Sequence, residues 1–434
     1  MMSYLFYLFF LIPMFFFNFW YFYQFFYMFF IFIFIFINSS LSFSSLNYLF
    51  GVDFISYVLV VLSFYIISLM SLASSSINNS IFFCFINYLI ALMLFIIFSS
   101  VNMLVMYISF EFVLLPLFTL ILGWGQYPER LSSGFYLFFF TLFGSLPLFL
   151  MIIYFYFDLM VLSFFFELSF SFNFFLHLFM VLPFLISLPI FMLHFWLPKA
   201  HVQAPISGSM ILAGVMLKIG GYGLIRFIYL NDYYFYNYSY IWFSFGLLGS
   251  LMVGFICLVQ VDIKCLIAYS SVAHMSMCLL GILTMTNLGV YGCLIMMVSH
   301  GLCSSGLFCL ANICYLRLNT RSLYLTKGLV SFMPSLSFFW FLFSGFNMGC
   351  PPSINFMSEL CMIISSLYYF NFSYLYLILS CFISACFSFY MYSFSQHGIF
   401  NSIYSHSSVS VSEFLLLVCH LYPLVSLMFL FMLL

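Results

Sequence analysis

Hydrophobic runs of about 20 residues follow one another along nearly the whole chain, separated by short polar or Gly/Pro segments. Each run is long enough to cross the ~30 Å hydrocarbon core of a bilayer as a helix. Lys, Arg, Asp and Glu make up only 4% of the 434 residues, far below the ~25% of a typical soluble domain. The chain is therefore predicted to be an all-α polytopic membrane protein, and a water-soluble enzyme is excluded.

The composition also narrows the range of ligands. The formal net charge is −1 and no basic cluster is present to hold phosphate groups, which excludes a nucleic-acid partner. The 13 cysteines form no Cys-x-x-Cys pair, and most lie inside apolar runs, which argues against a zinc or iron–sulfur site. We therefore expect no metal in this chain and interpret the thiols as apolar packing groups.

Polar and Gly/Pro interruptions divide the chain into about 14 predicted transmembrane spans. These spans cover residues 4–20, 21–37, 53–72, 81–98, 101–122, 133–157, 174–196, 205–229, 239–260, 264–285, 287–313, 331–368, 371–394 and 413–433.

Two of these boundaries rest on specific physical arguments. A single helix over 4–37 would be about 55 Å long, too long for the bilayer core, so we predict a hairpin near residues 18–24. The twelfth span is expected to be broken at residues 349–352, because Pro351 and Pro352 remove backbone donors. Such a break is tolerated at membrane depth only inside protein or beside water.

The basic residues give the predicted orientation. Six of the eight lie in loops on one face, whereas Arg226 alone faces the other way. By the positive-inside rule, the basic face is cytoplasmic or mitochondrial-matrix, and both termini lie on the opposite side. The six residues are Arg130, Lys199, Lys264, Arg317, Arg321 and Lys327.

Five ionisable residues fall near the middle of predicted spans: Glu111, Lys218, His274, His300 and Glu359. An unpaired charge at that depth costs between ~2.5 and more than ~10 kcal/mol. An interhelical hydrogen bond or a structural ion pair could explain each residue alone. Five together favour a buried polar axis parallel to the membrane, along which acids, an amine and imidazoles exchange protons.

Several segments of the chain carry specific motifs. The most specific is residues 193–226, from Leu-His-Phe-Trp-Leu-Pro-Lys-Ala-His to Leu-Lys-Ile-Gly-Gly-Tyr-Gly-Leu-Ile-Arg. Others are Phe110-Glu111, Pro128-Glu129-Arg130-Leu131, residues 262–271 with His274, His300-Gly301-Leu302, and Pro351-Pro352-Ser353-Ile354-Asn355 with Glu359. Together these motifs resemble the antiporter-like membrane subunits of respiratory complex I, and among them the subunit 4 family.

The resemblance runs from about residue 101 to 368, whereas the first hundred residues match in hydropathy alone. We therefore divide the chain into N-terminal transmembrane helices at 1–100, an antiporter-like proton-translocating core at 101–368, and C-terminal transmembrane helices at 369–434. The resemblance implies an antiporter-like fold of 14 spans, with two inverted five-helix repeats and broken seventh and twelfth helices.

The resemblance also implies a function. It indicates a membrane-arm subunit of NADH:ubiquinone oxidoreductase that moves protons across the mitochondrial inner membrane, with its basic loops in the matrix and its termini in the intermembrane space. Proton-relay roles fall on Glu111, Lys218, His274, His300 and Glu359, and Lys264 matches a further family lysine. NAD, FMN, iron–sulfur clusters and ubiquinone would be bound by other subunits. The expected partners are the antiporter-like subunits 2 and 5 and phospholipids such as cardiolipin.

One position departs from the family pattern. Ser187 stands two residues before Pro189, where the family carries a lysine that pairs with the glutamate corresponding to Glu111. We therefore predict ordered water, or a protonatable group from an adjacent helix or subunit, beside Glu111. Two alternatives stay open: a structural subunit whose channel is impaired by Ser187, or a stand-alone cation/proton antiporter module.

Overall fold

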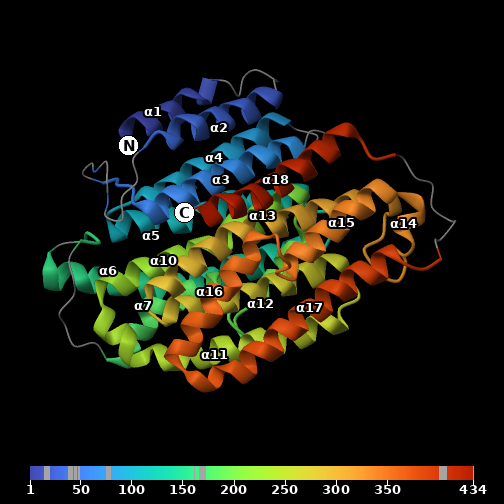
Figure 1. Ribbon diagram of the computed structural model, residues 1–434. Coiled ribbons are helices and arrows are strands. Elements are labelled where there is room, and N and C mark those ends of the chain that lie inside the picture. The colour runs from blue at the N-terminus through green and yellow to red at the C-terminus, as the bar shows by residue number, and fades with distance from the viewer. Residues whose placement is uncertain are drawn as a thin grey trace. The chain divides into compact units, whose positions relative to one another are not determined.

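Helices make up nearly all of the described chain, and they are drawn in chain order from blue to red in Figure 1. The computed structural model describes every residue except 14–19, 38–42, 44–45, 47–48, 75–79, 161, 166–172, 400–407 and 434. Within the described residues, the only extended pairings are isolated bridges such as Phe50 with Ser100.

Ten of the described helices are long and apolar enough to cross a membrane, and the two shorter segments Phe22–Ile35 and Phe174–Ser187 are also apolar. The prediction of an all-α polytopic membrane protein is therefore confirmed.

The chain divides into two units. Unit 1 comprises residues 1–187, 203–211 and 215–238, and unit 2 comprises 188–202, 212–214 and 239–434. The helices of the first half are α1 (Met2–Phe10), α2 (Trp20–Ile35), α3 (Phe54–Ala73), α4 (Ser80–Ser99), α5 (Met103–Trp124), α6 (Arg130–Leu159), α7 (Phe174–Ser187), α8 (Trp196–Gln203), α9 (Ile206–Ile211), the π-helix η2 (Leu212–Met216) and α10 (Leu217–Leu230).

The helices of the second half continue the same pattern. They are α11 (Asp232–Val259), α12 (Ile263–Leu283), α13 (Asn287–Leu318), α14 (Leu329–Phe332), α15 (Pro334–Asn347), α16 (Ile354–Tyr369), the 3₁₀ turn η3 (Asn371–Ser373), α17 (Tyr374–Gln396) and α18 (Val411–Leu433).

Local side chains fix several helix starts. The Asp53 side chain accepts a hydrogen bond from the Ser56 backbone, while the Ser56 hydroxyl accepts one from the Asp53 backbone, which makes a capping box at the start of α3. Asn102 caps α5, and the Thr286 side chain caps α13. These caps satisfy backbone N–H groups that have no partner inside the helix.

Glycines and aromatic rings set the packing inside each unit. In unit 1, the rings of Phe30 and Phe64 stack with centroids 4.1 Å apart, and a Cβ added at Gly223 of α10 would overlap the ring of Phe184 of α7. In unit 2, a Cβ at Gly306 of α13 would meet the ring of Phe343 of α15. The missing side chain thus lets neighbouring helices approach closely.

The two proline-marked segments are both interrupted. The predicted break at 349–352 is confirmed, because α15 ends at Asn347 and α16 begins at Ile354. The break that the family resemblance implies in the seventh span, 174–196, is also present, since α7 ends at Ser187 and the next helix begins at Trp196. Pro189 explains this interruption, because it lacks a backbone donor and disfavours helical geometry in the residue before it.

Two further predictions differ in detail. The turn of the hairpin predicted near residues 18–24 does not include residues 20–24, because α2 already begins at Trp20. Residues 14–19 lie outside the described part of the chain. The span predicted for 205–229 contains the π-helix η2 (Leu212–Met216) between α9 and α10. Nothing in the hydropathy of this span distinguishes a π-helix from an α-helix.

Candidate functional site

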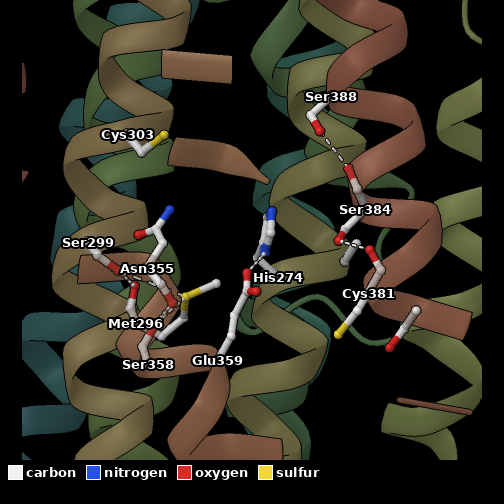
Figure 2. A network of polar contacts seen from close by, with 12 residues as sticks. His274, Met296, Ser299, Cys303, Asn355, Ser358, Glu359, Cys381, Ser384 and Ser388 are labelled. Carbon is white, nitrogen blue, oxygen red and sulfur yellow. Dashed lines mark hydrogen bonds and ion pairs between the residues drawn. The ribbon is translucent and has the colours of Figure 1, made fainter. Parts of the chain in front are cut away.

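In unit 2, His274 of α12 and Glu359 of α16 face each other (Figure 2). The Nδ1 of His274 lies 3.8 Å from the Oε1 of Glu359, and the two side chains are only 4% and 16% exposed. This distance is longer than a direct hydrogen bond, so one small movement or one bridging water would connect the two groups. The other ring nitrogen of His274, Nε2, is buried without a hydrogen-bond partner among the described residues.

The break between α15 and α16 positions Glu359. Gly349 adopts a φ of +74°, which glycine accepts readily, and a Cβ added there would lie 2.5 Å from the Oε2 of Glu359. The Asn355 side chain donates a hydrogen bond to the carbonyl of Phe346 over 2.8 Å, which satisfies one of the carbonyls freed at the end of α15. The carboxylate of Glu359 therefore packs directly against the backbone of the break.

A cavity adjoins this pair. It leaves about 20 Å³ for the centre of a water molecule, which is room for one water. Figure 2 shows Cys381 and Ser384 of α17 on the side of His274 that faces away from Asn355. The serine hydroxyls at the cavity donate to backbone carbonyls of their own helices but still offer acceptor lone pairs. The polar residues of its lining are Ser250, His274, Glu359, Ser380, Cys381 and Ser384.

His300 of α13 lies next to the pair. Its ring centroid is 5.7 Å from that of His274, with 50° between the ring planes. The Ser304 hydroxyl donates to the backbone carbonyl of His300 over 2.7 Å, so this hydroxyl stabilises the helix backbone rather than the imidazole. The structure thus brings three predicted site residues of unit 2 together: His274, His300 and Glu359.

Lys264 lies apart from these three residues. It is buried in the first turn of α12, with its Nζ 5.6 Å from the centre of the Tyr315 ring. Ten residues separate it from His274, which corresponds to about 15 Å along a helix. Any proton exchange between Lys264 and His274 therefore needs intermediate groups.

In unit 1, Lys218 is completely buried and is the second residue of α10. It follows the π-helical stretch Leu212–Met216 directly. π-helical turns are uncommon and occur frequently at functional sites, because the widened turn leaves backbone groups for other partners.

Glu111 of α5, also in unit 1, lies beside Ser145 of α6. The Ser145 hydroxyl donates to the carbonyl of Leu142 in its own helix over 3.2 Å and neighbours the carboxylate, while the Oε1 of Glu111 is buried without a hydrogen-bond partner among the described residues. The Ser187 hydroxyl is 3.0 Å from the carbonyl of Pro183 in its own helix. The polar neighbour found beside Glu111 is a neutral hydroxyl, and the ordered water or protonatable group expected there stays a prediction.

Two histidines lie near the break after α7. His194 and His201 are both buried, and the His201 ring stacks on Phe308 with centroids 4.8 Å apart and 4° between the planes. Within the described ranges, no group of three or more His, Cys, Asp or Glu side chains is arranged to hold a metal ion.

Sequence reasoning missed one buried and one partly buried ion pair. The Nη2 of Arg226 in α10 lies 2.6 Å from the Oδ1 of Asp53 at the start of α3. Burial alone would raise the pKa of Asp53, but the charge of Arg226 and hydrogen bonds from Arg226 and Ser56 outweigh it and hold this pKa below its usual value. The sequence signals only the helix cap, an aspartate followed three residues later by serine before an apolar run, and does not indicate Arg226 as the partner.

The second pair lies in unit 2. Arg317 was interpreted as a loop charge, yet it belongs to the last turn of α13 and binds Glu413 of α18 through both guanidinium Nη atoms, at 2.6 and 3.2 Å. Such bidentate geometry fixes the relative position of two helix ends.

The chain matches two family models that together cover most of its length. Residues 1–99 match the model described as NADH-ubiquinone oxidoreductase chain 4, amino terminus. Residues 100–388 match the model described as NADH:quinone oxidoreductase/Mrp antiporter, TM. The first match covers the N-terminal part of the chain, where the resemblance described above extended to hydropathy alone.

Similar proteins and structures agree with these matches. NADH-ubiquinone oxidoreductase chain 4 of Locusta migratoria is 46% identical over 433 residues, covering 98% of this chain and 97% of the relative. The chain 4 protein of Ceratitis capitata is 44% identical over 388 residues, covering 88% and 87%.

Two solved structures share the fold. A chain of respiratory complex I from Thermus thermophilus with bound NADH superposes with a TM-score of 0.85 at 22% identity, over 93% of this chain and 88% of the other. A chain of the Mrp complex from Dietzia sp. superposes with a TM-score of 0.74 at 15% identity, over 81% and 68%. At these identities the superpositions show an antiporter-like fold and nothing further.

Proposed function

Because this chain belongs to the family of NADH-ubiquinone oxidoreductase chain 4, an antiporter-like membrane subunit of complex I, we propose that its protons move through Glu111, Lys218, His300, His274 and Glu359. The chain is a multi-pass, proton-translocating subunit of NADH:ubiquinone oxidoreductase. NADH oxidation and ubiquinone reduction, with their flavin and iron–sulfur groups, are assigned to other subunits.

The arrangement of His274 and Glu359 carries the proposal. An imidazole and a carboxyl group, both buried and 3.8 Å apart beside a water-sized cavity, are suited to passing a proton between them. His300 extends this group by one further imidazole. A purely structural pair would be expected to close to hydrogen-bonding distance and to leave no space for water.

In unit 1, Lys218 is proposed as the central carrier and Glu111 as an entry group. The π-helical turn before Lys218 supports this role, as does the polar contact between Glu111 and Ser145. Lys264 is proposed as an additional carrier near the start of α12. Moving one charge across ~180 mV requires about 4 kcal/mol, which electron transfer elsewhere in the complex must supply.

The setting of the subunit follows from the same proposal. We assign it to the mitochondrial inner membrane, with 14 spans in two inverted repeats, if the segments interrupted near Pro189 and Pro351 each count as one span. The basic loops would face the matrix and both termini the intermembrane space. Antiporter-like subunits 2 and 5 and phospholipids such as cardiolipin are the proposed neighbours.

The test is the Lys218→Met variant of the parent complex, purified and reconstituted in lipid vesicles. We expect NADH oxidation to continue while the number of protons pumped per electron falls, because methionine fills the space of lysine but carries no proton. Lys327→Met, which removes a lysine from a loop, is the control and should leave the ratio unchanged. An unchanged ratio in Lys218→Met would support the alternative, a structural subunit whose channel is impaired by Ser187.

A further inference from the structure

The end of α10 carries a buried charged cluster that the proton relay does not use. The guanidinium of Arg226 lies 4.4 Å from the ring centre of Phe43 and 4.7 Å from that of Tyr222, so two aromatic rings cover it. Its Nη2 donates to the Oδ1 of Asp53 over 2.6 Å, and both side chains of this pair are only 5% exposed. The Tyr222 hydroxyl donates a hydrogen bond to the carbonyl of Phe98 in α4 over 2.9 Å.

The cluster is aligned with the proposed carrier of unit 1. Lys218, Tyr222 and Arg226 are spaced four residues apart on α10, so they lie on one face of the helix. Two helical turns, about 12 Å, separate Lys218 from Arg226 along the axis. Asp53 precedes α3, which places the carboxylate at a helix end.

A proton cannot hop through the guanidinium of Arg226 itself. Arginine stays protonated in proteins and has no acceptor, so it neither takes up nor releases a proton during transport. Fixed positive charges of this kind exclude protons and cations from narrow pores. The aromatic rings on the guanidinium also leave little space for water around it.

We propose that Arg226, held in place by Asp53, Phe43 and Tyr222, is an electrostatic barrier that prevents protons on Lys218 from leaking along α10 to the end of this helix. The inference rests on the proposed role of Lys218. It adds that protons do not leave unit 1 past the Asp53–Arg226 pair, where the start of α3 meets the end of α10. Protons on Lys218 can therefore move only to the other residues of the relay. Asp53 acts as a positioning residue that holds the guanidinium.

The test measures passive proton leak in the absence of NADH. The parent complex carrying Arg226→Met is reconstituted in vesicles, a pH gradient is imposed, and its decay is followed with a pH-sensitive dye. We expect the decay to be about tenfold faster than with the unmodified complex, which corresponds to a barrier lower by about 1.4 kcal/mol. Arg226→Gln, a polar and neutral replacement, should leak similarly and serves if the methionine variant does not assemble.

Matched variants separate the charge from the packing. Asp53→Asn breaks the ion pair but preserves the helix cap and the guanidinium, so the decay should stay slow. Arg317→Met removes a partly buried arginine–carboxylate pair in unit 2, and its decay should also stay slow. Slow decay in both Arg226→Met and Arg226→Gln would overturn the proposal. Equal leak in Asp53→Asn and Arg226→Met would overturn it as well, by showing that the intact pair, rather than the positive charge, is what matters.

A double variant distinguishes this inference from the proposed function. Adding Lys218→Met to Arg226→Met should return the decay to its slow rate, because the leak starts at Lys218. A persistent leak would overturn the assignment of Lys218 as its source. Pumping by Lys218→Met alone tests the relay independently, since that experiment measures protons moved per electron and needs no leak.

Discussion

The Nδ1 of His274 and the Oε1 of Glu359 lie 3.8 Å apart, although one residue belongs to α12 and the other to the helix that follows the break near Pro351. The carboxylate also rests on the backbone at Gly349, so its position depends on the break itself. The interruption of the helix therefore brings an acid next to an imidazole, at a place where an unbroken helix would present different residues.

Replacing Glu359 by Gln tests this pair. Glutamine keeps the shape but cannot carry a proton, so we expect proton transfer through this subunit to slow by about 100-fold or more. The measurement is protons pumped per electron in vesicles. Glu413→Gln, at the ion pair with Arg317, is the matched control and should leave the ratio unchanged. A normal ratio in Glu359→Gln would contradict the relay.

Ser145 offers a second test, near Glu111. Its hydroxyl is the polar neighbour of that carboxylate, so Ser145→Ala should make ionisation of Glu111 more costly and lower the pumping ratio without loss of assembly. Ser187→Ala is the control: both serine hydroxyls donate to carbonyls of their own helices, and Ser145 in addition neighbours Glu111. Equal effects of the two variants would remove Ser145 from the proton path.

Gly223 tests the packing of unit 1. A methyl group at this position would overlap the ring of Phe184, so Gly223→Ala should destabilise the contact between α10 and α7 by about 1–3 kcal/mol. We expect a lower yield of assembled complex and a lower thermal transition. Gly123→Ala, at the end of α5 where a Cβ meets nothing within 4 Å, should behave like the unmodified protein.

The Asp53–Arg226 pair predicts a pH dependence. The pKa of Asp53 is lower in the folded protein than its ordinary value of 3.8, because Arg226 and Ser56 stabilise the carboxylate. Its contribution to stability is therefore complete above that ordinary value and is lost only as the pH falls through the lowered one. The difference in thermal transition between the unmodified complex and Asp53→Asn should therefore stay constant from about pH 8 to about pH 5. A difference that shrinks within this range would contradict an ion pair that stays charged there.

The parts of the fold that depend on local physics were predictable from the sequence. Span positions follow from hydropathy, and the break near Pro351 follows from missing backbone donors. Hydropathy continues across Pro189, so the interruption after α7 was predictable from the family resemblance and not from hydropathy. The π-helical stretch Leu212–Met216 has no known signal in a single sequence.

The site was only partly predictable. The position of His274, His300 and Glu359 near the middle of predicted spans identified each residue separately. Their proximity depends on how α12, α13 and α16 pack, which the sequence does not give. Asp53 and Arg226 are 173 residues apart, and each resembles an ordinary charge at a helix end. A pairing of this kind arises from tertiary structure, and no local pattern specifies it.

The π-helix also makes the direction of Lys218 sensitive to chain length. Each residue advances an α-helix by about 100°, so the extra residue held in Leu212–Met216 rotates everything after it relative to α9. Loss of a single codon here would shorten the span by only one residue and leave it strongly hydrophobic, while turning the lysine amine toward a different neighbour. A deletion that hardly alters the hydropathy of the span would thus change the direction in which the Lys218 amine points.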